Sequence, residues 1–228
     1  MIVTDEQIKY GLIAPMKLKL IFGILAISIV AYSCKKDNAS NSEDVASQIN
    51  KFPIETLSNS EKQAILFIRE EEKLAHDVYV TLFNKWKVNI FENIASSEQV
   101  HSNAVSTLIQ RYGLIDPVGS NGVGIFHDTI LQKLYDTLIQ VGFQSELMAH
   151  HIGAEIEELD IADIMNMELI SDNQDLNFVL SNLKKGSRNH LRSFNEKIIS
   201  AGSSYSPKHI GLSLFNDIIN SPRETGGW

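Results

Sequence analysis

Glu98 and His101 are the residues of this chain whose types and spacing point most directly to chemistry. Residues three apart are neighbours on a helix surface, so Glu-x-x-His places a carboxylate and an imidazole over one point. Phe91, Ile94 and Val105 recur at helical spacing on the same face. Charged or polar groups on an apolar face are unfavourable unless something compensates them. A bound metal cation is the simplest compensation.

Two further helical segments carry single ligand-type side chains on apolar faces. Glu72 is the only charge on the stripe that runs from Ile65 to Leu82, and Tyr79 lies two turns further along the same stripe. The hydroxyl of Tyr79 is placed to hydrogen-bond near a site at Glu72. His190 is the lone imidazole of its stripe. We therefore expect Glu72 and His190 to be ligands and Tyr79 to be the catalytic side chain beside them.

A fourth segment, which begins near Ser145, carries several acids and two histidines. Glu155 and Glu158 are three residues apart on a broad apolar face, so both are expected to point inward as ligands. Glu157 and Asp160 are expected to face solvent.

Together these residues match the donor set of a paired metal centre. Bundles that hold two iron or manganese ions use a Glu from each of two helices and Glu-x-x-His from each of the other two. Carboxylates balance the charge of the cations and imidazoles complete the coordination. The last helix offers Ser187-x-x-His190 instead of Glu-x-x-His. Glu155 and Glu158 could replace the missing carboxylate, or the site could hold one ion or none.

The elements that must position these residues are all helices. Ser58-x-x-Glu61 is a capping box that opens the first long helix. No convincing strand pattern is present, so the fold class is all-α: a four-helix bundle, with an additional helix ended by Gly142 between the second and third ligand-bearing helices. We place the bundle at residues 57–201 and a C-terminal tail that packs on it at 202–228.

Composition narrows the function classes. The net charge is −8, with 43% hydrophobic and 21% charged residues, which is ordinary for a globular domain. This balance argues against a nucleic-acid surface. The only cysteine is Cys34, so disulfides and Cys-based zinc sites within one chain are excluded.

The N-terminal part has the pattern of an export signal. Two lysines after Met16 precede the apolar run 20–32, which is short for a membrane-spanning helix. The run ends at Cys34 and resembles a bacterial lipoprotein signal, which implies cleavage before Cys34 and its lipidation. Residues 1–33 are thus expected to be an N-terminal extension and signal, with Met1 or Met16 as the start, and 34–56 a flexible tether. The expected location is the cell envelope, lipid-anchored to a bacterial membrane.

Four blocks of the chain stand out together: Arg69–Tyr79, Ser97–His101, Gly153–Ile161 and Gly186–Phe194. These blocks resemble a ferritin-like domain family of unassigned function, DUF2202. The resemblance covers about residues 57–208 and implies a ferritin-like four-helix bundle. Glu72 followed by Tyr79 also matches a Glu-x6-Tyr spacing seen near ferroxidase centres of ferritin relatives.

Two functions follow as hypotheses. In the first, an exported, lipid-anchored bundle binds two iron or manganese ions and carries out oxidase or peroxidase-type chemistry, as a di-iron oxidoreductase. In the second, the bundle is a metal-binding or interaction module of the cell envelope without turnover. A metal-free, stable protein would indicate a helical scaffold. A homodimer is a candidate assembly in each case.

Overall fold

The computed structural model describes residues 44–226. Cys34, the apolar run 20–32 and the predicted signal lie outside the described residues. Within 44–226, none of the helices combines the length and the hydropathy that a membrane crossing requires.

The described chain is all-helical, as predicted. The additional helix lies between the second and third ligand-bearing helices. The helices are α1 (Val45–Ile49), α2 (Asn59–Trp86), α3 (Asn89–Arg111), α4 (Thr129–Gly142), α5 (Glu146–Glu168), α6 (Gln174–Ser200) and α7 (Leu212–Asn220).

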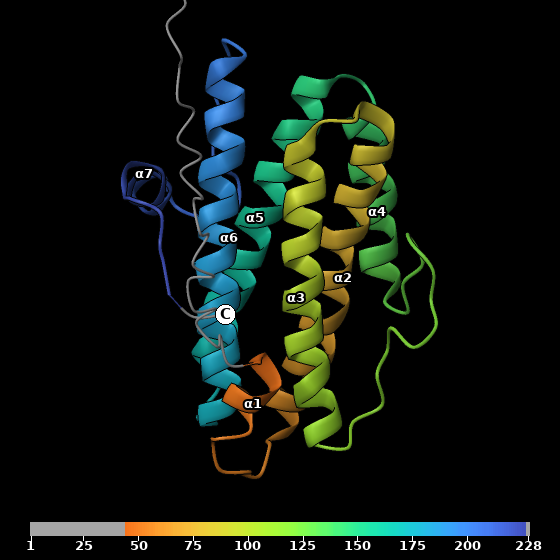
Figure 1. The fold of residues 1–228 in the computed structure, drawn as a ribbon, viewed down its shortest axis with the longest axis vertical. Coiled ribbons are helices and arrows are strands. Elements are labelled where there is room, and N and C mark those ends of the chain that lie inside the picture. Colours follow the sequence, from red (N-terminus) through yellow and green to blue (C-terminus); the bar gives the residue numbers. More distant parts are fainter. Residues whose placement is uncertain (1–43, 227–228) are drawn as a thin grey trace, which may run out of the picture. The chain divides into compact units, whose positions relative to one another are not determined.

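Four long helices form the bundle, and the shorter ones pack on its outside (Figure 1). The helices α2 and α3 form one closely packed pair, and α5 and α6 form the other. The pairs meet through α3 with α6 and through α2 with α5. Helix α4 packs on α2 and α5, whereas α7 packs on α6. Helix α5 is therefore covered by α2, α4 and α6.

The start of α2 follows the sequence signal. Ser58 accepts a hydrogen bond from the backbone N–H of Glu61, and the Glu61 carboxylate accepts one from the N–H of Ser58. This reciprocal pair satisfies two donors that a helix N-terminus otherwise leaves open. The second oxygen of Glu61 also accepts a hydrogen bond from Asn173, which ties the start of α2 to the start of α6.

The apolar core is divided into two layers. One layer lies at the end of the bundle that contains Tyr79 and Phe194, and the other at the end that contains Ile65 and Leu180. Along α3 the first layer ends at Ala95 and the second begins at Ala104. The Glu98-x-x-His101 pair lies between them, so a polar level is enclosed by apolar packing on both sides.

The segments that flank the bundle are more ordered than a tether would be. Residues 44–56, predicted as the end of the tether, contain α1, and Ile49 is fully buried in the second apolar layer. Transfer of the apolar Ile49 side chain out of water lowers the free energy, and this stabilises the ordered turn that α1 forms. At the other end of the chain, Arg192 donates a hydrogen bond to the carbonyl oxygen of Ile218 and holds α7 against α6.

Candidate metal centre

All four bundle helices contribute a side chain to the polar level. Glu72 comes from α2, Glu98 and His101 from α3, Glu157 from α5 and His190 from α6. They form two groups, each with ligand atoms that lie within 4.8 Å of one another: Glu72, Glu98 and His101 in the first, and Glu98, Glu157 and His190 in the second. Glu98 belongs to both groups.

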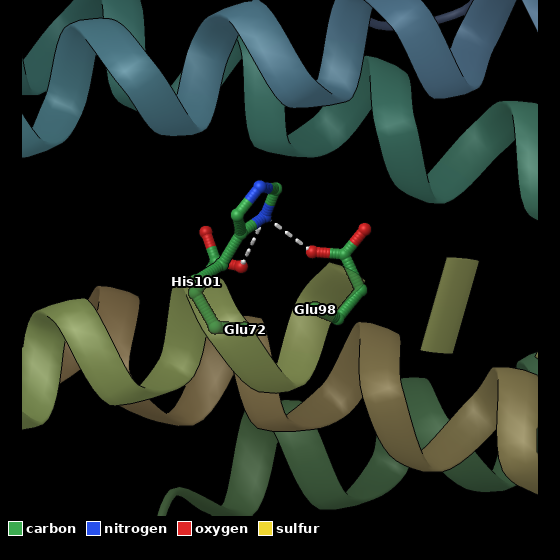
Figure 2. A group of neighbouring side chains, drawn as sticks. All are labelled: Glu72, Glu98 and His101. Carbon is green, nitrogen blue, oxygen red and sulfur yellow. Dashed lines mark hydrogen bonds and ion pairs between the residues drawn. The ribbon is translucent and has the colours of Figure 1, made fainter. Parts of the chain in front are cut away.

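The first group is centred on the imidazole of His101. Its Nδ1 atom lies 2.6 Å from Glu98 Oε2 and 3.3 Å from Glu72 Oε2. Figure 2 shows both carboxylates directed at this one nitrogen, in the space between the α2–α3 pair and the facing helices. The three residues are at most 5% exposed.

The second group mirrors the first on the opposite helix pair. His190 Nδ1 lies 2.7 Å from Glu98 Oε1 and 3.4 Å from Glu157 Oε2. The rings of His101 and His190 have centroids 5.7 Å apart. The two oxygens of Glu98 therefore serve one imidazole each, which is the arrangement of a carboxylate that bridges two sites.

The electrostatics of this level are dominated by Glu98. Burial alone would raise the pKa of the Glu98 carboxyl, but the neighbouring His101 and His190 outweigh it and lower the pKa. Burial would likewise lower the pKa of both imidazoles, and Glu98 reverses this. The pKa of His190 rises to about 9 and that of His101 rises well above its ordinary value. Both imidazoles therefore favour the protonated form when no metal competes.

For the other acids of the polar level, Glu72, Glu157 and Asp160, the nearby imidazoles do not outweigh the effect of burial. Burial raises the pKa of Glu72 to about 7, although His101 opposes it. Burial also raises the pKa of Glu157, and it raises that of Asp160 well above its ordinary value, with further contributions from the surrounding carboxylates. A second cationic group at this level would stabilise all of these carboxylates.

The polar level fits a pair of divalent cations. Within the described chain, Glu72 Oε2, Glu98 Oε1, Glu157 Oε2 and both oxygens of Asp160 are buried without a hydrogen-bond partner. Several of these atoms lie at ion-pair distances from an imidazole, but not at hydrogen-bonding angles. Buried polar groups are normally satisfied, and ions are one way to satisfy them. These four carboxylates carry the charge that balances two divalent ions, and the donors are the oxygen and imidazole types that iron and manganese accept.

Two residues predicted as ligands lie elsewhere. The Glu158 carboxylate accepts hydrogen bonds from the backbone N–H groups of Lys208, His209 and Ile210 and from the hydroxyl of Tyr205. Glu155 pairs with the ammonium of Lys208. The expectation that both acids point into the bundle centre is wrong, because the C-terminal segment supplies their partners.

Conversely, Glu157 and Asp160 do not face solvent as expected. Glu157 is fully buried and Asp160 is 2% exposed. They lie on the stripe of α5 that also contains Gly153, where the close approach of α6 places the Phe194 ring against the glycine. Residues 153, 157 and 160 follow helical spacing, as do the predicted ligands Glu155 and Glu158. The spacing of 153, 157 and 160 was therefore the sequence signal that could have identified Glu157 and Asp160.

Three further residues adjoin the ligand groups: Gly186, Ser187 and Tyr79. A Cβ atom on Gly186 would lie 2.4 Å from Cε1 of His101, so glycine leaves the room that this ring occupies. Ser187, at the position of the missing carboxylate, donates its hydroxyl to the carbonyl oxygen of Leu183 on its own helix. Tyr79 donates to Glu157 Oε1 at 2.5 Å.

The fold and the polar level together define an all-α bundle protein with buried carboxylate and imidazole groups that could bind metal ions. The model of the family described as "Uncharacterized protein domain (DUF2202)" matches residues 61–222. The chain belongs to this family.

One relative is similar over nearly its whole length. The chain is 45% identical over 178 residues to the uncharacterized protein MJ0754 of Methanocaldococcus jannaschii, and the match covers 78% of this chain and 96% of that protein. The crystal structure of this hypothetical protein MJ0754 superposes with a TM-score of 0.75, covering 75% of this chain and 98% of that one. The two proteins therefore share the helical-bundle fold.

Proposed function

We propose that this protein binds two iron or manganese ions at the polar level of a ferritin-like bundle and uses them for oxidase or peroxidase-type chemistry. The observation that carries the proposal is the position of Glu98, whose two oxygens face His101 in one group and His190 in the other. Glu72 completes the first group and Glu157 the second. Glu72 and His101 would hold one ion, Glu157 and His190 would hold the other, and Glu98 would contribute to both.

The protein supplies the ligands, the shielding and a hydrogen-bond donor. A bound redox metal would supply electrons to dioxygen or peroxide, with Fe(II) itself or an outside reductant as the electron source. Apolar layers on both sides of the level exclude water and strengthen electrostatic interactions within it. The hydroxyl of Tyr79 holds Glu157 Oε1, which leaves Oε2 for a cation. Asp160, three residues further on α5, is the acid best placed to stand in for the carboxylate that Ser187 lacks.

The test is metal content followed by oxidation. Purified full-length protein is analysed for iron and manganese, and Fe(II) oxidation in air is then followed by absorbance. We expect the wild type to bind two ions and to oxidise Fe(II), and Glu98→Ala to lose both properties. Glu158→Gln is the matched control, because this buried neighbour on α5 is outside the polar level. Unchanged oxidation in Glu98→Ala would refute the proposal, and metal without oxidation would indicate a binding module without turnover.

We further propose that the domain is held at a bacterial membrane by a lipid on Cys34. The support is the charged and apolar pattern that precedes this cysteine. Mass spectrometry of the protein expressed with its complete N-terminal segment should show cleavage before Cys34 and a lipid on it. Recovery of an unmodified Cys34 in the aqueous fraction would refute this proposal.

A further inference from the structure

A line of acids connects the polar level with the surface. It consists of Asp163, Glu71 and Asp160, which we term the acidic seam, and Asp160 is the member that it shares with the polar level. Glu71 comes from α2 and the two aspartates come from α5, and these helices pack against each other. Glu71 is close enough to Asp163 and to Asp160 to interact with both. Asp163 is partly exposed, whereas Glu71 and Asp160 are buried.

The outer end of the acidic seam opens at a surface cavity of about 510 Å³. On α2 the wall follows the stripe of Ser60, Gln63 and Phe67, and the next position inward on that stripe is Glu71. On α5 the wall contains Asn166 and Asp163, and the next positions inward are Asp160 and then Glu157. The two helical stripes thus lead from the cavity to the candidate ligands.

The inner members of the acidic seam are buried and incompletely satisfied. Glu71 is 4% exposed and Asp160 is 2% exposed. Glu71 Oε2 and both oxygens of Asp160 have no hydrogen-bond partner within residues 44–226. Along α2, Glu71 follows Phe67 of the cavity wall by one helical turn and directly precedes Glu72 of the first ligand group.

This arrangement is not what internal packing requires. An apolar residue at either buried position would avoid the free energy of desolvating a carboxyl group. Closely spaced carboxylates in a low-dielectric passage do, however, attract cations and raise their local concentration. A cation that enters the protein loses part of its hydration shell, and the unpartnered carboxylate oxygens can replace the lost water ligands.

From this geometry we infer that the acidic seam is the access route by which divalent cations move from the surface cavity between α2 and α5 to the paired metal centre. The inference rests on the proposed function. Asp163 captures the cation at the cavity wall, Glu71 receives it inside the bundle, and Asp160 passes it to Glu157 and Glu72. The acidic seam is therefore expected to control how fast metal arrives, and the polar level to control how much is held.

The experiment separates rate from capacity. Metal-stripped full-length protein is mixed with Co(II) under anaerobic conditions, and the visible absorbance of bound cobalt is followed by stopped flow. We expect Asp163→Asn and Glu71→Gln to reach the same final cobalt content as the wild type, with uptake slowed about tenfold or more. Added salt should slow the wild type more than Asp163→Asn, because screening weakens the attraction that this substitution removes.

The matched control is Glu92→Gln. Glu92 lines a different surface cavity, between α2 and α3, and lies outside both the acidic seam and the polar level. Its substitution should leave the uptake rate unchanged. Normal uptake rates in both Asp163→Asn and Glu71→Gln would overturn the inference, as would slow uptake in Glu92→Gln alone. A wild type that takes up no cobalt would instead overturn the proposed function and the inference with it. Because Asp163 is partly exposed, its variant remains informative if Glu71→Gln fails to fold.

Discussion

Replacing Gly186 by alanine tests the close approach of α6 to His101. The new Cβ atom would lie 2.4 Å from Cε1 and 2.6 Å from Nε2 of the imidazole, whereas ordinary contacts begin at 3.4 Å. The ring cannot rotate away freely, because its Nδ1 atom lies 2.6 Å from Glu98 Oε2. Either α6 or the imidazole must shift by a substantial fraction of an ångström.

The magnitude follows from two opposing effects. Alanine in place of a mid-helix glycine favours the folded state by about 1 kcal/mol. Overpacking a buried site opposes it by about 1–3 kcal/mol. We therefore expect the metal-free Gly186→Ala protein to lose up to about 2 kcal/mol of unfolding free energy. A displaced ligand of this kind should weaken metal affinity by about 10–100-fold, as loss of a supporting contact does elsewhere.

The assays are urea denaturation of the metal-free protein and calorimetric titration with Co(II). Gly153→Ala is the matched control, since its Cβ would lie 2.4 Å from the Phe194 ring, which is not a ligand. Both variants should lose stability, but the larger loss of metal affinity should be confined to Gly186→Ala. A Gly186→Ala protein that gains stability and binds cobalt like the wild type would refute the reasoning.

Three further predictions follow from the site. Glu157→Gln should lose at least one of two cobalt ions by elemental analysis, whereas Glu158→Gln should keep both. In urea denaturation, Glu158→Gln should instead lose about 1.5–3 kcal/mol of unfolding free energy, because the charged hydrogen bonds to backbone N–H groups are removed. His101→Ala should retain about one ion, but Glu98→Ala should retain neither, because Glu98 belongs to both groups. The pKa of His190 rises from 6.5 to about 9 on folding, so its stabilising contribution is complete below pH 6.5 and disappears as the pH rises through 9, a loss on the order of 3 kcal/mol. Urea denaturation of the metal-free protein should show this loss, and saturating cobalt should reverse the trend, because metal binds the deprotonated ligands.

The sequence predicts α3 and α6 well because each of them has an apolar face and a more exposed face. The first turns of α2 share this pattern, whereas its residues 70–75 are buried all round. On such helices the inward direction can be inferred from the spacing of apolar residues. Glu72, Glu98, His101 and His190 were predicted in this way, and the structure brings all four to one level. The capping box at Ser58 and Glu61 was predicted for the same reason, since its signal is local.

Other features depend on contacts between distant segments, which no local pattern contains. Glu70 is two residues from the candidate ligand Glu72 in the sequence. Its carboxylate nevertheless accepts a hydrogen bond from the backbone N–H of Asp128 and holds the segment before α4. Asp77 likewise accepts one from the N–H of Gly124. No sequence pattern singles out either acid, because their partners are backbone groups some fifty residues away.

Helix α5 shows why periodicity alone could not select its ligands. It is covered by α2, α4 and α6, and the C-terminal segment covers Glu158, so buried residues occur around nearly its whole circumference. A helix that is buried all round has no solvated face from which the inward direction can be inferred. The pairs 155/158 and 157/160 have the same spacing, and only their partners differ: backbone N–H groups reach Glu158, whereas Asp160 and Glu157 Oε2 have no hydrogen-bond partner in the described chain. A buried carboxylate that the backbone already satisfies needs no cation, and one that is left unsatisfied does. The contacts made by residues 202–226 therefore determine which pair of acids on α5 remains unsatisfied. The sequence of α5 alone does not contain this information.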